Sequence, residues 1–154
     1  MERKSGFRID FGFFRRLAER FAKREKTDAA AMKKEEELFR KMEYLVAFEG
    51  LYKKKHLSMI MLSREAGSNR SYVSAALRHK GLNFSCYLGS LRVQKVMQLL
   101  ADEEFANMEA GRVADLCGFT SERTMNYYLN RMLGMTFTAL RRRAVLLREG
   151  ERRG

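Results

Sequence analysis

Ten polar side chains at the starts of two short predicted helices have the residue types that contact nucleic acid. The first group contains Asn69, Arg70, Ser71, Ser74 and Arg78, and the second contains Ser121, Glu122, Arg123, Asn126 and Tyr127. Arginine suits guanine, asparagine suits adenine, and glutamate can accept a hydrogen bond from cytosine. Backbone N–H groups at a helix start can bind phosphate. The two groups therefore predict contacts to the bases and phosphates of DNA.

These side chains need two similar pairs of helices to position them. Apolar spacing predicts helices over 29–49, 59–66, 70–80, 85–100, 108–117, 122–132 and 138–147. Gly67 and Gly118 are expected to end the first helix of each pair, and Asn69 and Ser121 to cap the second. This layout is that of a helix-turn-helix unit, whose second helix, here called the reading helix, enters the major groove.

The rest of the composition also favours helices. Proline is absent, and the dominant residues include Leu, Met, Ala, Lys, Arg and Glu. We expect an all-α fold, in which two helix-turn-helix subdomains are joined by a long central helix and preceded by an N-terminal helical extension. The inward faces of the reading helices are predicted to be Tyr72, Val73, Ala76 and Leu77, and Met125, Tyr128, Leu129 and Met132.

The formal net charge of +12 favours a polyanionic partner, but much of the excess lies near the two ends of the chain. An apolar stripe runs near the N-terminus, through Phe7, Phe11, Phe14, Leu17 and Phe21. Basic residues fill its other faces, so residues 7–24 could contact a membrane or a partner, or pack on their own domain.

Nothing in the sequence indicates catalysis, a metal or a cofactor. The histidines, His56 and His79, have no patterned nucleophile or carboxylate beside them. Cys86 and Cys117 lack metal-ligand spacing and are expected to be inert core residues. No small-molecule site is visible, and no uncharged apolar run is long enough to span a membrane. We expect a non-enzymatic protein of the reducing cytoplasm.

Several segments carry a family resemblance. The strongest are Asn69–Ser74, Asn83–Leu88, Leu91–Val93, Val113–Ser121 and Gly134–Thr136. Residues 36 to 143 resemble the DNA-binding domain of AraC/XylS-family transcription regulators, in the version common in Bacteroidetes. The family usually has proline where this chain has Phe137. It often has basic residues in place of Ala75 and Tyr127. The sequence therefore does not determine which bases the reading helices contact.

The resemblance implies a bacterial, sequence-specific transcription regulator that binds double-stranded DNA, with RNA polymerase as a further candidate partner. The expected organisation is an N-terminal extension over 1–35, a DNA-binding domain over 36–147 and a disordered basic tail over 148–154. Within the domain, the units are expected at 57–84 and 108–137, with a linker helix at 85–100. The alternative is a protein–protein or membrane-surface interaction module with a degenerate, weakly DNA-binding double unit.

Overall fold

The computed structural model describes residues 29–153, and every regular element in that range is helical. The α-helices are α2 (Ala29–Glu43), α3 (Met59–Glu65), α4 (Arg70–His79), α5 (Phe84–Ala101), α6 (Ala110–Leu116), α7 (Glu122–Leu133) and α8 (Phe137–Arg153). The shorter helical segments are a π-helix, η1 (Tyr44–Phe48), and two 3₁₀ helices, η2 (Leu51–Lys53) and η3 (Glu103–Phe105). The all-α prediction is confirmed. The apolar stripe from Phe7 to Phe21 lies outside the described residues, and no helix within them is long and apolar enough to cross a bilayer.

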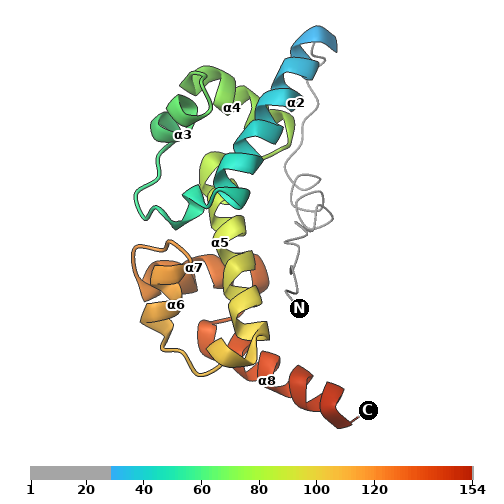
Figure 1. The fold of residues 1–154 in the computed structure, drawn as a ribbon, viewed down its shortest axis with the longest axis vertical. Helices are drawn as coiled ribbons and strands as arrows, with labels where there is room; N and C mark the ends of the chain where they lie inside the picture. Colours follow the sequence, from blue (N-terminus) through green and yellow to red (C-terminus); the bar gives the residue numbers. More distant parts are fainter. Residues whose placement is uncertain (1–28, 154) are drawn as a thin grey trace, which may run out of the picture.

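Helix α5 forms the axis of the described part of the molecule. Figure 1 shows α2, α3 and α4 around its first half and α6, α7 and α8 around its second half. Leu88 and Leu91 of α5 belong to one buried apolar cluster, which includes residues of α2, α3 and α4. Val93 and Val96 belong to a second cluster, with residues of α6, α7 and α8. The two helix-turn-helix units therefore have separate cores that share one helix.

Side-chain caps define where α3, α4 and α7 begin. The Oγ of Ser58 accepts a hydrogen bond from Met61 N at 3.2 Å, and Asn69 Oδ1 accepts one from Tyr72 N at 3.0 Å. Ser121 Oγ accepts one from Thr124 N at 3.1 Å. These caps satisfy N–H groups that have no partner within the helix, and each typically contributes about 1 kcal/mol. The caps predicted at Asn69 and Ser121 are confirmed.

The turn after α6 needs glycine for two reasons. Gly118 has a φ of +82°, a left-handed conformation that disfavours other residues. A Cβ atom there would also lie 2.0 Å from the carbonyl oxygen of Tyr52 in η2. Because that neighbour is backbone, it cannot swing aside. The glycine thus lets the turn of the second unit touch the segment that precedes the first.

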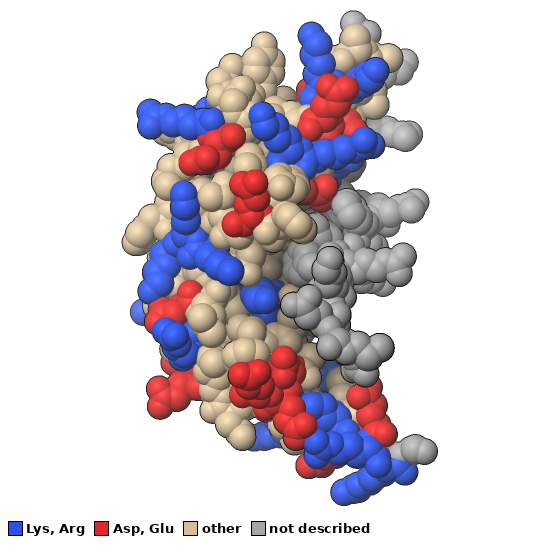
Figure 2. All heavy atoms as spheres, viewed as in Figure 1, with Lys and Arg blue, Asp and Glu red and all other residues tan. Residues whose placement is uncertain are grey.

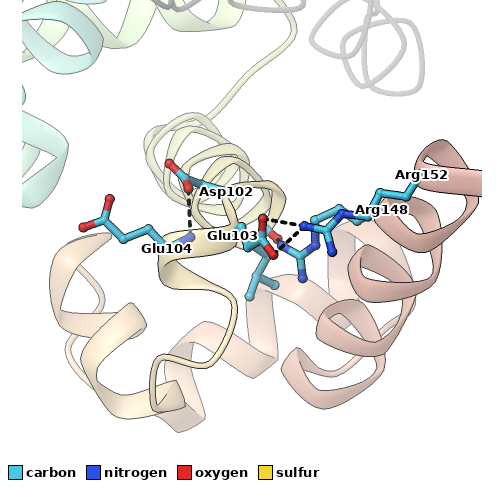
Figure 3. A network of polar contacts seen from close by, with 6 residues as sticks. Asp102, Glu103, Glu104, Arg148 and Arg152 are labelled. Atoms are coloured by element: carbon cyan, nitrogen blue, oxygen red, sulfur yellow. Dashed lines mark hydrogen bonds and ion pairs between the residues drawn. The ribbon is translucent and has the colours of Figure 1, made fainter.

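Helix α8 is longer than the sequence indicated. It was expected to end near Leu147 before a disordered tail, but it continues to Arg153. Arg148 Nη1 donates to the carbonyl oxygen of Leu100 at 2.7 Å, and Arg152 Nη2 donates to both carboxylate oxygens of Glu103 at 2.6 and 2.7 Å. Figure 3 shows these arginines reaching from α8 to the end of α5. These contacts tie the last turns of α8 to the domain.

Candidate nucleic-acid interface

Helix α4 presents a small polar face to solvent. Val73, Ala76 and Leu77 are fully buried and anchor the helix on the first core. The opposite face carries Ser71 and Arg78, which are exposed. Arg70 is also exposed, whereas Ser74 is half-buried on the flank between Arg70 and this face. Helix α4 contains no acidic residue, so this surface suits a polyanion.

Tyr72 does not pack inward as predicted. It is 63% exposed and lies on the flank of α4 opposite Arg70. The buried face of α4 is narrow, since Val73, Ala76 and Leu77 already fill it. The prediction was wrong because it extended the apolar face by one residue too many.

Helix α7 presents a wider face. Met125 and Leu129 are fully buried, and Arg123, Tyr127 and Asn130 are exposed on the opposite side. Glu122 is also exposed, and Asn126 is half-buried. Arg123 and Tyr127 were predicted as contact residues, whereas Asn130 and Arg131 were not, although Arg131 is exposed as well. Their spacing was the available signal, since residues three and four positions after Tyr127 lie on the same side of a helix.

In three of the predicted contact residues, a side-chain oxygen atom already accepts a hydrogen bond from a backbone N–H group of the protein. Asn69 and Ser121 form the caps of α4 and α7. Asn126 Oδ1 accepts a hydrogen bond from Phe137 N at 2.7 Å, which links α7 to the start of α8. A bidentate contact to adenine needs both the amide oxygen and the amide nitrogen of asparagine. Asn126 therefore also has a structural role, and its contact with a base stays a prediction.

Tyr127 and Arg131 form a pair on the exposed side of α7. Arg131 Nη1 donates a hydrogen bond to the Tyr127 hydroxyl at 2.8 Å, and this bond raises the pKa of Arg131 above its ordinary value. The Tyr127 ring packs edge-on against Tyr128, with ring centroids 5.2 Å apart. Tyr128 in turn packs against the buried ring of Phe119 at 5.9 Å. The pair is thus connected to the second core.

A cleft of about 620 Å³ lies beside this pair. It is lined by Met59, Arg70, Asn83, Phe84, Ser85, Cys86, Tyr127, Tyr128 and Arg131. These residues come from the starts of α3, α4 and α5 and from the middle of α7, so the cleft separates the two reading helices. One thiol opens into it, since Cys86 is half-buried, whereas Cys117 is fully buried and burial raises its pKa to about 12. Cys117 is thereby an inert core residue, as predicted, whereas the same prediction was wrong for Cys86, which lies in the wall of the cleft and not in the core.

Arg92 of α5 contacts both the segment before the first unit and the core of the second unit. Its Nε donates to the carbonyl oxygen of Tyr52 at 2.9 Å, and its Nη2 donates to that of Lys54 at 2.8 Å. Its guanidinium also lies 5.9 Å from the ring centre of Phe119, in the second core. Burial lowers the pKa of Arg92 to about 10, which leaves it charged at neutral pH. Because the buried guanidinium group donates to two backbone carbonyl groups, it fixes the position of α5 relative to the segment before the first unit.

An exposed ion pair also connects the segment before the first unit to the second unit. Lys55 Nζ lies 2.6 Å from Asp115 Oδ1 of α6, and the lysine lowers the pKa of that carboxyl group. Such exposed pairs contribute little to stability. On the face in Figure 2, basic side chains alternate with clusters of acidic ones, so that face offers no continuous basic surface. On this face, charge alone therefore does not locate the interface.

The sequence family agrees with this geometry. Residues 62–143 match the family described as Helix-turn-helix domain, and they extend from within α3 through the second unit to the start of α8. The chain belongs to this family, whose domains are of the AraC type. It is a DNA-binding transcription regulator and not an enzyme. The resemblance to AraC-type domains, predicted from segments such as Val113–Ser121, is thereby confirmed.

A solved structure shares the fold of this AraC-type domain. It is described as a DNA-binding transcriptional dual regulator from Escherichia coli K-12, and it superposes with a TM-score of 0.60 at 18% sequence identity. The match covers 81% of this chain and 99% of that one. At this identity the likeness concerns the fold alone. No curated protein matches the sequence.

Proposed function

We propose that the domain regulates transcription by inserting α4 and α7 into successive major grooves on one side of a DNA duplex. The observation that carries this proposal is that both reading helices are capped, anchored by a buried face and polar on the opposite face. A major groove admits an α-helix. Two such helices on one chain would let a monomer recognise an asymmetric site.

Arg123 is the residue to which we assign direct reading of a base. It is exposed in the first turn of α7, on the side opposite Met125 and Leu129. A guanidinium group can donate two hydrogen bonds to one guanine, which contributes about 1–3 kcal/mol of discrimination. Arg70 and Arg78 would supply charge along α4, and the N-termini capped by Asn69 and Ser121 would receive phosphates.

The spacing of the two reading helices would come from α5. Reading helices in adjacent major grooves are about 34 Å apart along the DNA. Because α5 is shared by both cores, a duplex that does not match the spacing of α4 and α7 has to bend, at a cost on the order of 1–6 kcal/mol. The DNA-binding domain would extend from residue 36 to the end of α8.

The test separates base reading from attraction to phosphate. Sequences selected from a random pool of duplexes by the intact protein would define a cognate site. Arg123→Ala should weaken cognate binding by about 10-fold or more while changing binding to random DNA much less. Arg153→Ala, which removes an exposed arginine at the end of α8, is the matched control and should change neither. Equal loss on both DNAs would refute base reading by Arg123.

An interaction surface is a second candidate role, favoured by one observation. Phe48 is 78% exposed, and its ring stacks on that of Tyr44 with centroids 5.1 Å apart. Exposed aromatic pairs are typical of protein interfaces. In a transcription regulator, RNA polymerase is the partner that we expect this aromatic pair to contact. Tyr44→Ala with Phe48→Ala should then leave duplex affinity unchanged and lower the transcriptional response, whereas a loss of duplex binding would count against this role.

A further inference from the structure

The cleft between the reading helices lies where a bound duplex has to cross. Arg70 of α4 contributes to one wall, and Tyr127 and Arg131 of α7 contribute to another. Between two successive major grooves, DNA presents a minor groove bordered by its two phosphate backbones. A duplex that holds both reading helices must therefore carry a backbone segment past this cleft.

We propose that the cleft is a phosphate-binding site, in which Arg131 and Arg70 hold a phosphodiester of the DNA backbone midway between the two grooves. This proposal rests on the proposed function, because it assumes that both reading helices engage one duplex. It adds a contact that depends on no base. Its role would be to fix the register of the protein on the DNA, as phosphate contacts do.

The chemistry of the cleft suits one phosphodiester. Two guanidinium groups come from different helices, and no carboxylate is found among the described residues that line the cleft. Guanidinium groups bind phosphate oxygens with paired, charge-assisted hydrogen bonds. Phosphate is attracted both by the charge of Arg131 and by its forked geometry, and these two contributions can be separated by mutation.

Tyr127 acts as a positioning residue for this contact. Its hydroxyl accepts the hydrogen bond from Arg131 Nη1, which holds a long and otherwise mobile side chain in one orientation. Less conformational entropy is then lost when the phosphate binds. Tyr127→Phe would keep the ring contact with Tyr128 but lose the hydroxyl, and it should weaken all duplexes by about 3-fold, less than the loss of Arg131 itself.

Salt dependence supplies the first test. Arg131→Ala should lower affinity for cognate and random duplexes equally, by about 10-fold, and reduce the slope of log affinity against log salt by about one. Between 50 and 200 mM salt, the variant should then lose about 3-fold less affinity than the wild type loses. Arg131→Lys keeps the charge and should keep the slope. Arg153→Ala should behave as wild type. An unchanged slope in Arg131→Ala would overturn the proposal.

Cys86 supplies a second test, because it is a thiol in the wall of the cleft. Alkylation of the intact protein with a maleimide, followed by mass spectrometry, should label Cys86 and spare the buried Cys117. A bound duplex should slow labelling of Cys86 at least several-fold. Labelling at the same rate in a saturated complex would overturn the proposal. Protection by inorganic phosphate alone that equals protection by the duplex would overturn the assignment to the DNA backbone and would indicate a site for free phosphorylated compounds.

The proposed function and the phosphate site can be refuted separately. If the wild-type protein binds no duplex at any salt concentration, the proposed function is refuted and this inference with it. If duplex binding and the effect of Arg123→Ala are as expected, but Arg131→Ala and the Cys86 labelling are not, only the phosphate site is refuted.

Discussion

Replacing Gly89 with alanine should displace the second reading helix. Gly89 is buried in α5, and an added Cβ would lie 2.3 Å from Cε1 and 2.4 Å from Cδ1 of Tyr128 in α7. Non-bonded carbon atoms pack at about 3.5–4.0 Å. The Tyr128 ring would therefore have to move by at least about 1.2 Å. Because that ring is packed between Phe119 and Tyr127, we expect α7 to move with it.

The expected cost has two opposing parts. Overpacking a filled site typically costs about 1–3 kcal/mol. Replacing glycine by alanine inside a helix returns up to about 1 kcal/mol. The free energy of unfolding should therefore fall, by up to about 2 kcal/mol. Affinity for a cognate duplex should fall by about 10-fold or more, since hydrogen bonds from α7 to bases weaken when the helix shifts by 1 Å or so.

Gly111→Ala is the matched control for this substitution. Gly111 also lies within a helix, α6, but a Cβ there meets nothing within 4 Å. This variant should gain about 0.5–1 kcal/mol of stability and bind DNA as the wild type does. Urea denaturation followed by circular dichroism measures the stability, and fluorescence anisotropy with a labelled duplex measures the affinity. If Gly89→Ala gained stability as Gly111→Ala should, the close packing of α5 on Tyr128 would be refuted.

Two further predictions concern ionisable side chains that are partly or fully buried. Burial is the largest cause that raises the pKa of Glu43, from 4.5 to about 7, so stability present below pH 4.5 should be lost as the pH rises towards 7. Glu43→Gln should abolish this loss and be more stable at pH 8 by about 2 kcal/mol, and a parallel decline in both proteins would contradict it. Arg92→Met should lower the free energy of unfolding by about 2–4 kcal/mol, because it leaves the carbonyl groups of Tyr52 and Lys54 without their donor. Denaturation at neutral pH would show this, and a stability equal to that of wild type would exclude a structural role.

Local chemistry was the part of the fold that the sequence predicted well. Ser121 stands just before the apolar face of α7, and its hydroxyl caps that helix as its residue type indicated. The start of α5 was predicted one residue late, at Ser85 instead of Phe84, where Asn83 caps the helix by accepting a hydrogen bond from Cys86 N. Helix boundaries depend on such single hydrogen bonds. The existence of a helix was therefore easier to predict than the residues at which it begins and ends.

Contacts between distant segments could not be predicted in the same way. Arg92 reaches carbonyl groups 38 and 40 positions earlier, and Arg152 reaches a carboxylate 49 positions earlier. No periodicity encodes such pairs, so α8 was expected to end where its amphipathic pattern weakened. The cleft was invisible for the same reason, since its walls come from four helices. Asn130 and Arg131 are different, because they could have been found by following the face of Tyr127 one turn further.

The functional consequence of the fold follows from the double use of α5. One face of this helix completes the first core through Leu88 and Leu91, and its later turns complete the second core through Val93 and Val96. The relative position of α4 and α7 is then set by residues that touch no DNA, such as Gly89 and Arg92. Specificity for the spacing of the two half-sites would be determined in the protein interior, whereas specificity for bases would be determined on the outer faces of the reading helices. Substitutions could therefore change either property while leaving the other in place.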